Sequence, residues 1–296
     1  MDRRYPIQAF DPERFAPFFG DSTKLLKHEL LPGGACNSNY LVHTPDGQRT
    51  LCRLHQRGQP QLEQFVTRIA KDLVPCPDYL WVGDGVSVQT FIDGTHFEPT
   101  KELMHQAGEL IARLSQFTFE RPGDLQIDGS IQPINGWPSY QQGLTDLLHN
   151  ATVKTYLSSA IVRKCEQLLA THTGTLADFD RCRSLVHGDF RPDNILVANG
   201  SIVAVLDWEF SHSGCSYMDI GNLLRHLSPE WERPFRNGLT DAGFELPDDW
   251  RFRAALIDLS SHLEFLTSNR SDAFKQQCVK RIEALIVRNG VPVNSG

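Results

Sequence analysis

One short stretch of the chain carries three polar side chains at the ends of apolar runs. Asp189 and Asn194 lie in the segment 185–194, with the sequence L-V-H-G-D-F-R-P-D-N, and Asp207 follows the apolar run 201–206. Carboxylate and amide oxygens are hard donors, and Mg²⁺ in proteins takes one or two carboxylates together with phosphate oxygens. These residue types therefore indicate a site for Mg²⁺ and a phosphate compound.

The order of the residues indicates how these side chains meet. Asn199-Gly200 separates the two apolar runs before Asp207 and is a strong signal for a tight β-hairpin. A hairpin here returns Asp207 beside Asn194, while Asp189 lies five residues before Asn194 on the same loop. We expect an oxygen-only metal site next to a carboxylate that can reach an attacking hydroxyl group.

The N-terminal part of the chain is rich in strand signals. About the first thirty residues place phenylalanines among Pro and Asp and predict a short helical preface. Alternating runs at 39–43 and 50–54, joined by an Asp-Gly turn, predict a hairpin. Runs at 79–82 and 86–92 predict two more strands, and helical spacing marks the segment 61–73 between the two pairs.

The chain beyond Asp93-Gly94 has helical spacing, with clear apolar stripes over 103–117 and 274–286. We expect this helical character to be interrupted once, at 184–209, by the hairpin described above. A strand-rich part of about ninety residues followed by a helical part is typical of an α+β fold. It suggests two lobes with a cleft between them.

Bulk composition limits the classes of partner. The chain has 296 residues, 40% of them hydrophobic, and a net charge of −7 at pH 7, as globular proteins often have. It has no Lys/Arg run of the kind found in nucleic-acid-binding proteins and no apolar stretch long enough to span a bilayer. Seven widely spaced cysteines without a C-x-x-C pair argue against a zinc site and a disulfide framework. We expect a cytoplasmic protein with neither nucleic acid nor membrane as partner, and the sequence carries no sign of oligomeric state.

The catalytic segment resembles that of a known family. The pattern H-G-D-x4-N at 187–194, with an Asp after the hairpin, resembles the signature of the aminoglycoside phosphotransferase and choline kinase superfamily. It is similar to the protein-kinase string H-R-D-x4-N and the D-F-G that follows. Gly188 in place of Arg, and D-W-E at 207–209, are typical of the small-molecule branch. The resemblance covers about residues 30 to 230 and implies a protein-kinase-like bilobal fold, with an N-terminal nucleotide-binding lobe over 1–93 and a catalytic lobe over 94–296.

The resemblance also implies roles for the catalytic residues. Asp189 is expected to act as catalytic base or hydroxyl-orienting group, and Arg191 to neutralise charge near the γ-phosphate. Asn194 and Asp207 are expected to hold Mg²⁺. His187 is expected to brace the loop rather than to move protons.

In the N-terminal lobe, the resemblance implies a turn at 31–40 that covers the phosphates of ATP or GTP. Arg53 is expected to bind phosphate with Glu63 of the following helix as its partner, and the strand 88–94 to hold the adenine edge through its backbone. The predicted nucleotide-binding residues are Gly33, Gly34, Asn39, Arg53, Glu63, Gln89 and Phe91.

The predicted function is a kinase that transfers the γ-phosphate of ATP or GTP, with Mg²⁺, to a hydroxyl group of a small molecule such as an aminoglycoside, amino alcohol or sugar. One alternative is a pseudokinase-like regulatory module, although Asp189, Asn194 and Asp207 are all present. A protein kinase is disfavoured because no activation segment with an A-P-E-like anchor follows Asp207. A hydrolase that binds metal through His187, Asp189 and His212 lacks further ligands at metal spacing.

Two further groups of acids have open interpretations. Asp219 is interpreted as a helix N-cap or a loop anchor rather than a catalytic group. Four acids of the C-terminal region either bind a cationic acceptor or lie on a solvated helix face: Asp248, Asp249, Asp258 and Glu264.

Overall fold

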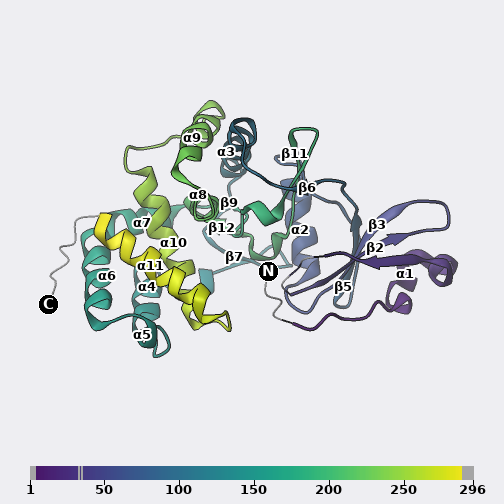
Figure 1. Cartoon of the computed structure of the whole chain (residues 1–296), viewed down its shortest axis with the longest axis horizontal. Helices are drawn as coiled ribbons and strands as arrows, with labels where there is room; N and C mark the ends of the chain where they lie inside the picture. Colours follow the sequence, from purple (N-terminus) through teal and green to yellow (C-terminus); the bar gives the residue numbers. More distant parts are fainter. Residues whose placement is uncertain (1–4, 33, 35, 289–296) are drawn as a thin grey trace.

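The computed structural model describes residues 5–32, 34 and 36–288. A five-stranded antiparallel sheet occupies one end of the molecule, and most helices gather at the other end (Figure 1). The sheet has the strand order β1-β2-β3-β5-β4. Its strands are β1 (Lys27–Leu30), β2 (Ser38–His43), β3 (Arg49–Leu54), β4 (Tyr79–Gly83) and β5 (Val86–Thr90).

The predicted hairpins of this sheet are confirmed, with small shifts of their ends. β2 pairs with β3 in the register Leu41 with Leu51, and β3 pairs with β5 in the register Arg53 with Ser87. The helical preface is also confirmed, as η1 (Pro12–Phe15), α1 (Ala16–Phe19) and η2 (Gly20–Leu25), and it packs Phe15 into the sheet core. The edge strand β1 was not predicted, because its four residues are all exposed and carry no apolar alternation.

Helix α2 (Pro60–Ala70) connects the sheet to the rest of the molecule. It begins with Pro60 in its first turn, where a missing N–H costs nothing, and it ends at Ala70, earlier than the predicted end at residue 73. Its buried Val66 and Ala70 belong to the large hydrophobic cluster of the helical part, not to the sheet core. Glu63, one helical turn earlier, therefore lies between the two parts.

The helical part contains two small antiparallel sheets. One has the strand order β11-β10-β6 and contains the predicted hairpin, and the other has the order β8-β7-β12-β9. The expectation of a single interruption of the helical character is therefore wrong. The predicted hairpin consists of β10 (Ile195–Ala198) and β11 (Ser201–Val205). The other strands have two or three residues each, too few to show a period-2 pattern in the sequence. They are β6 (Thr95–His96), β7 (Gly123–Leu125), β8 (Ile131–Gln132), β9 (Ser184–Val186) and β12 (His212–Gly214).

The helices of this part surround one large core. The apolar stripes predicted over 103–117 and 274–286 are the inward faces of α3 and α11. The helices are α3 (Lys101–Gln116), α4 (Tyr140–His149), α5 (Val153–Tyr156), α6 (Ser159–Thr171), α7 (Thr173–Arg181), α8 (Tyr217–Leu224), α9 (Glu232–Asp241), α10 (Trp250–Thr267) and α11 (Asp272–Arg288), with short 3-10 turns η3 (Ile134–Gly136), η4 (Pro192–Asn194), η5 (Trp208–Phe210) and η6 (Pro229–Trp231).

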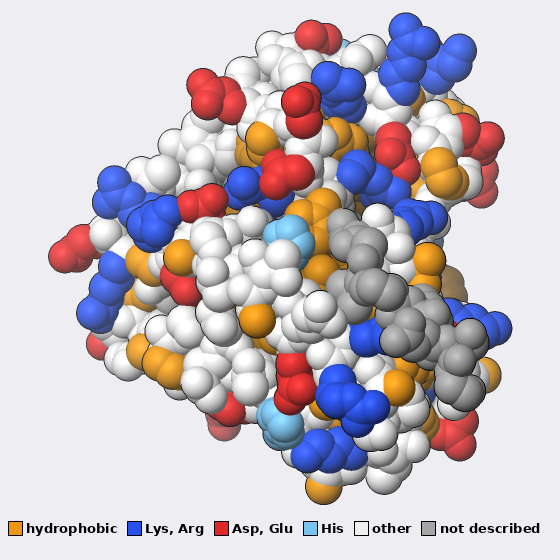
Figure 2. All heavy atoms as spheres, turned by 90° about the vertical axis from the view of Figure 1, so that its left-hand side faces the viewer, with side chains coloured by type: hydrophobic (Ala, Val, Ile, Leu, Met, Phe, Trp, Pro, Cys, Tyr) orange, Lys and Arg blue, Asp and Glu red, His pale blue; other side chains and the backbone are white. Residues whose placement is uncertain are grey.

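The surface of the helical part carries charges of both signs, and the cysteines form no disulfide bonds. Basic and acidic side chains are interspersed over the face of the helical part (Figure 2). Among the described residues, no helix combines the length and apolar character needed to cross a membrane. All seven cysteines carry free thiols.

Candidate active site

The catalytic loop begins where β9 ends, and a buried carboxylate anchors it. Asp219 Oδ2 accepts a hydrogen bond from the His187 N–H at 2.8 Å, and Asp219 Oδ1 accepts one from the Gly188 N–H at 2.8 Å. Burial raises the pKa of Asp219 to about 7. Asp219 is thus a loop anchor, one of its two interpretations. The N-cap interpretation is wrong, because Ser216 precedes α8 and Asp219 lies inside its first turn.

The buried His187 ring joins this loop to the end of the hairpin. Its Nδ1 accepts the Asp189 N–H at 3.2 Å, and its Nε2 lies 2.9 Å from the Leu206 carbonyl oxygen, to which it donates. Burial lowers the pKa of His187 to about 4, so the ring is neutral at physiological pH. Both ring nitrogens are occupied by the backbone, as expected of a bracing residue.

Gly188 is required by the close approach of two loops. Its φ is +82°, and a Cβ atom at this position would lie 2.4 Å from the Phe210 carbonyl oxygen. A side chain here would be strained by the backbone conformation and would also collide with backbone that cannot move aside. The structure therefore explains why glycine stands where protein kinases carry arginine.

Asp189 is held by two neighbours on the same loop. Asn194 Nδ2 donates to the Asp189 carbonyl oxygen and to Asp189 Oδ2, both at 2.9 Å, and Arg191 Nε donates to Oδ2 at 3.0 Å. Burial raises the pKa of Asp189, and the Arg191 charge opposes this rise. The side chain keeps 24% of its surface exposed. Both of these side-chain contacts lie on Oδ2, and neither involves Oδ1.

The hairpin returns the chain to this loop. Ile195 pairs with Val205, and the Leu206 N–H donates to the Asn194 carbonyl oxygen at 2.7 Å, which places Asp207 beside Asn194. Asp207 has a left-handed φ of +69° and a carboxylate that is 30% exposed. A non-glycine residue in this conformation is uncommon and often marks a functional position.

The donor set at this point fits Mg²⁺. Asn194 uses its amide nitrogen on Asp189, which leaves Oδ1 as a neutral oxygen donor next to the Asp207 carboxylate. One carboxylate and one amide oxygen, completed by phosphate oxygens, suit this ion. No cluster of three or more His, Cys, Asp and Glu side chains with metal-site geometry occurs among the described residues, so the hydrolase alternative gains no support.

Arg53 of β3 links the sheet to the hairpin. Its Nη1 donates to Glu63 Oε2 at 3.3 Å and to Asp207 Oδ1 at 3.0 Å, and its Nε donates to Asn39 Oδ1 at 3.0 Å. Burial alone would lower the pKa of Arg53, but the Asp207 and Glu63 carboxylates hold it above its usual value. Four of the predicted residues therefore form one contact network.

The surroundings of Glu63 include residues that the sequence did not point to. Tyr79 Oη donates to Glu63 Oε2, and His55 Nδ1 lies 3.6 Å from Glu63 Oε1. Burial raises the pKa of Glu63 to about 7, and burial lowers the pKa of His55 to about 3, so His55 is uncharged. In the sequence, Tyr79 and His55 lie at the ends of two strands and carry no signal of their own. Only the pairing of the strands in the folded protein places them beside Glu63.

Among the other predicted nucleotide residues, Gln89 joins the surroundings of Glu63 through Ser87, whose Oγ lies 2.9 Å from His55 Nε2. Gln89 is buried on β5 and donates to Ser87 Oγ at 3.1 Å, while Phe91 lies beneath Arg49, whose guanidinium carbon is 5.1 Å from the ring centroid. Gly34 has a φ of +77°, the left-handed conformation that glycine adopts freely. Gly33 lies outside the described residues.

The segment after Asp207 adds contacts between the two lobes. The Arg57 guanidinium lies over the Phe210 ring at 4.7 Å, and a Cβ on Gly58 would lie 2.9 Å from Glu209 Oε2. Burial, together with the neighbouring Asp207 charge, raises the pKa of Glu209 to about 7. Glu209 was not predicted as a site residue. Its place in the D-W-E string is the only signal that the sequence offers.

The four C-terminal acids divide into different environments. Asp258 is buried and paired with Arg225 and His262, whereas Asp248 and Asp249 are exposed, Asp249 in an ion pair with Arg253. Glu264 instead accepts a hydrogen bond from Asn135 Nδ2 at 3.2 Å. We call Asp124, Asn135 and Glu264 the acidic cluster.

Asn135 holds the acidic cluster together. Its N–H donates to Asp124 Oδ2 at 2.8 Å, while its amide contacts Glu264. Burial and the Asp124 charge raise the pKa of Glu264, and Arg57 is near enough to oppose this rise. Arg57 also stacks on the Phe210 ring, and the Phe210 carbonyl oxygen lies close to Gly188 of the catalytic loop.

A family model described as the phosphotransferase enzyme family matches residues 27–256. Among curated proteins, the homoserine kinase of Rhodospirillum rubrum is 24% identical over 222 residues, which cover 68% of this chain and 64% of that protein. The homoserine kinase of Mesorhizobium japonicum is 24% identical over 84% of this chain and 81% of its own length. The chain spans slightly less than two thirds of the length of the first two curated relatives.

Solved structures give the same architecture. A thermostable mutant of aminoglycoside phosphotransferase APH(4)-Ia, in ternary complex with ADP and hygromycin B, has a TM-score of 0.66 at 18% identity, covering 90% of this chain and 95% of that one. Macrolide 2′-phosphotransferase MphH from Brachybacterium faecium has a TM-score of 0.62 at 13% identity, covering 90% and 92%. At these identities the likeness shows the fold, and it confirms the α+β, protein-kinase-like bilobal architecture.

Proposed function

The chain belongs to the phosphotransferase enzyme family, and from this premise we propose that it transfers the γ-phosphate of ATP or GTP to a hydroxyl group of a small molecule, with Mg²⁺ as metal. The family membership and the curated kinases at low identity support a small-molecule kinase. Beyond this, we propose ATP or GTP as the phosphate donor, Mg²⁺ as the metal and an alcohol group as the acceptor.

The observation that carries the proposal is the joint position of Asp189, Asn194 and Asp207. The loop and the hairpin bring them together through the Asn194–Asp189 hydrogen bonds and the Leu206–Asn194 backbone bond. Arg53 then adds a buried cation on the Asp207 side. A base, two metal ligands and a phosphate-binding cation on a rigid framework are what phosphoryl transfer requires, since positioning and electrostatics carry most of the catalysis.

Each side chain has one task in this proposal. Asp189 Oδ1 accepts the proton or the hydrogen bond of the acceptor hydroxyl, while Asn194 and Arg191 fix the carboxylate through Oδ2. Arg191 and Arg53 neutralise charge on the transferred phosphoryl group. Asn194 Oδ1 and the Asp207 carboxylate would hold Mg²⁺, which supplies positive charge to the phosphate oxygens.

We further propose lobes over residues 1–93 and 94–296, with the nucleotide between them. Arg53 and the turn at Gly34 would contact its phosphates, and the backbone after β5 its base. Asn39 and Glu63 would act through Arg53, which they orient by hydrogen bonds. We propose the cytoplasm, where ATP and Mg²⁺ are available, as the place of action.

For the acceptor, the acidic cluster supports a hydroxyl compound that also carries an ammonium group. Asp124 and Glu264 are both held by Asn135, and Glu264 keeps exposed surface despite the protein around it. Two carboxylates held close together favour a nearby cation. Homoserine is the first compound to test, because the curated relatives at 22–24% identity are homoserine kinases.

The test is the release of ADP or GDP with Mg²⁺ and a panel of homoserine, choline and an aminoglycoside. The proposal expects acceptor-dependent turnover in the wild type, lost in Asp189→Asn and kept in Glu230→Gln, since Glu230 is an exposed acid on η6, away from the loop. Turnover that is equal in Asp189→Asn and the wild type, or no turnover with any acceptor of the three classes, would contradict it.

A further inference from the structure

Two of the seven cysteines come together where strands β9 and β12 end. Ser184 of β9 pairs with Gly214 of β12. Cys182 lies two residues before Ser184, and Cys215 directly follows Gly214. The two thiol groups are hydrogen-bonded to each other. Because the two residues are far apart in the sequence, no C-x-x-C spacing marks the pair, and only the pairing of the strands brings it together.

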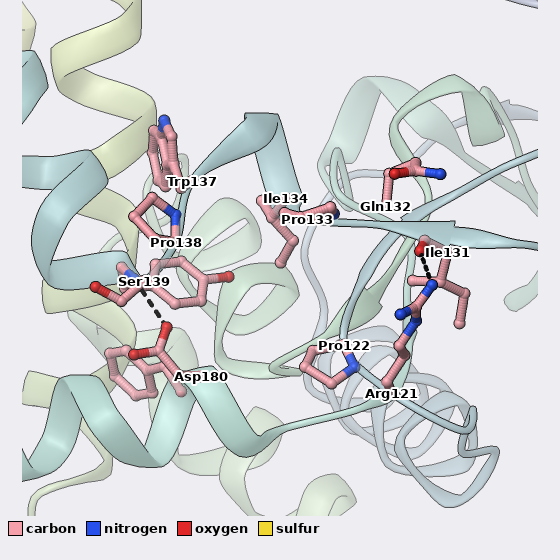
Figure 3. A pocket seen from close by; sticks show the side chains of 12 residues that line it. Arg121, Pro122, Ile131, Gln132, Pro133, Ile134, Trp137, Pro138, Ser139 and Asp180 are labelled. Carbon is pink, nitrogen blue, oxygen red and sulfur yellow. Dashed lines mark hydrogen bonds between the residues drawn. The ribbon is translucent and has the colours of Figure 1, made fainter.

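Cys182 is the more accessible of the two thiols. It is half-buried, whereas Cys215 is 2% exposed. Cys182 follows the last residue of α7, and the end of this helix borders a hollow of about 210 Å³ in the surface, with Asp180 on one side of it (Figure 3). A small oxidant can therefore approach Cys182 from solvent, while the protein shields Cys215.

The surroundings of Cys182 favour its thiolate. The hydrogen bond from Cys215 lowers the pKa of Cys182, and the Arg181 and Arg253 charges lower it further, although burial and the Asp178 charge oppose them. When it is protonated, Cys182 Sγ donates to the Asp178 carbonyl oxygen at 3.4 Å. The thiolate is the nucleophilic form of cysteine, and reactive cysteines typically lie in partly exposed, electropositive surroundings.

Cys215 has the properties of a second, resolving thiol. Burial and the hydrogen bond to Cys182 both raise the pKa of Cys215, so this group keeps its proton. A sulfenic acid on an exposed cysteine condenses with a neighbouring thiol to a disulfide. Three other cysteines have no such character, because burial raises the pKa of Cys52, Cys76 and Cys165 to about 12.

We propose that Cys182 and Cys215 form an oxidation site, at which hydrogen peroxide or another hydroperoxide converts the two thiols to a disulfide. The Cys182 thiolate attacks one peroxide oxygen, so that an S–O bond forms, the O–O bond breaks and the departing hydroxide becomes water by taking up a proton from solvent. The Cys215 sulfur then attacks the Cys182 sulfur, and its proton leaves with the hydroxyl group as a second water. The two thiols lose two electrons, which reduce one peroxide to two waters.

The bond would join two segments that support the catalytic loop. Strand β9 leads directly into His187, and α8, which begins two residues after Cys215, carries the Asp219 carboxylate that anchors His187 and Gly188. Disulfides in reducing compartments are usually transient or redox-sensing, and this pair fits a reversible role. Oxidation needs neither nucleotide nor acceptor, so it is tested independently of the proposed function.

The test treats the full chain with hydrogen peroxide, without nucleotide, and digests it without reduction. A peptide cross-linked between Cys182 and Cys215 is expected, and the thiols titrated in denaturant are expected to fall from seven to five. Dithiothreitol should restore all seven. Before oxidation, iodoacetamide should label Cys182 at least about tenfold faster than Cys76, which is also half-buried but has a raised pKa.

Variants of single cysteines assign the steps. Cys215→Ser is expected to leave Cys182 as a sulfenic acid, which dimedone traps, and Cys182→Ser to leave Cys215 as a thiol. The matched control Cys76→Ser is expected to form the cross-link as the wild type does.

The wild type alone decides the outcome, so the proposal stays testable even if a variant does not fold. Absence of the cross-linked peptide after peroxide treatment, a disulfide between Cys182 and a different cysteine, or labelling of Cys76 as fast as that of Cys182 would overturn it.

Discussion

Arg53 Nη1 and Asp207 Oδ1 lie 3.0 Å apart, although the first residue belongs to the five-stranded sheet and the second follows the hairpin of the helical part. The Arg53 guanidinium is almost fully buried, and the Asp207 carboxylate remains 30% exposed. The pair therefore joins the two lobes at the point where we place metal and phosphates.

The first prediction concerns the catalytic carboxylate. Asp189→Asn keeps the shape of the side chain but removes the charge that attracts the acceptor proton. Turnover is expected to fall by about two to four orders of magnitude. Nucleotide affinity should change little, because Asp189 does not hold the metal in this account. Single-turnover kinetics measure the fall in rate, and nucleotide titration measures the affinity. A loss of nucleotide binding equal to the loss of rate would argue that Asp189 is a metal ligand instead.

The second prediction uses two glycines with similar backbone conformation. Gly188 and Gly200 have φ values of +82° and +76°, but a Cβ on Gly188 meets the Phe210 backbone, whereas nothing lies within 4 Å of a Cβ on Gly200. Gly200→Ala is expected to cost ~1 kcal/mol of unfolding free energy with unchanged turnover. Gly188→Ala should cost more and should also lower turnover. Thermal unfolding and steady-state rates are measured for both variants. If Gly188→Ala and Gly200→Ala lose the same stability and the same turnover, the close contact of Gly188 with the Phe210 backbone is unimportant.

Much of this loop was predictable because its determinants are local. The H-G-D-x4-N string, the Asn199-Gly200 turn and the apolar runs beside it predict the hairpin, and the structure has it at β10 and β11. Asp189, Asn194 and Asp207 come together because the turn pairs the two strands, and a register shift between Leu196 and Val197, which the sequence did not predict, sets the final pairing of Ile195 with Val205. The contact between Arg53 and Asp207 spans 154 residues and depends on how the lobes pack, which no local pattern encodes.

Other features escaped prediction for related reasons. Strands β7, β8, β9 and β12 have two or three residues each, and a period-2 pattern needs more. The Tyr79–Glu63 contact depends on strand register at a bulge in the β4–β5 pair. Asp258 and Glu264 are both acids of α10, yet Asp258 pairs with Arg225 inside the protein, and a position on the helix does not reveal such an internal partner.

The third prediction concerns the pH dependence of stability. The pKa of Glu209 is about 7 in the folded chain against 4.5 as its ordinary value, so the folded state binds more protons than the unfolded state between these values. Stability is therefore higher below about pH 4.5 and is lost as the pH rises through about 7. Glu63 and Asp219 contribute to the same loss, so Glu209→Gln should remove only the share of Glu209 and raise the unfolding free energy at about pH 8 by about 1–3 kcal/mol.

Denaturant unfolding of the nucleotide-free protein at several pH values measures this effect. Glu230→Gln serves as control, because Glu230 is an exposed acid on η6 outside the lobe contact. The control is expected to leave the pH profile of the wild type unchanged. A Glu209→Gln profile as steep as that of the wild type would show that Glu209 is not the group that titrates.

The fourth prediction addresses the acceptor. If the acidic cluster binds an ammonium group, Glu264→Gln should raise the KM of an amine-bearing acceptor about tenfold, since it removes one charged partner. The KM of the nucleotide and the turnover number should stay close to those of the wild type. Asp248→Asn, an exposed acid elsewhere in the C-terminal region, is the matched control. An unchanged acceptor KM in Glu264→Gln would place the ammonium group elsewhere.

The most direct test of the metal–nucleotide site is the thermal midpoint with ATP or GTP, each with and without Mg²⁺. Ligand at about a hundred times its Kd adds roughly 2.7 kcal/mol, which is several degrees for a chain of this size. We predict a Mg²⁺-dependent rise in the wild type and in Glu230→Ala, and its loss in Asp207→Ala. No rise with either nucleotide, or an equal rise in Asp207→Ala, would contradict the account.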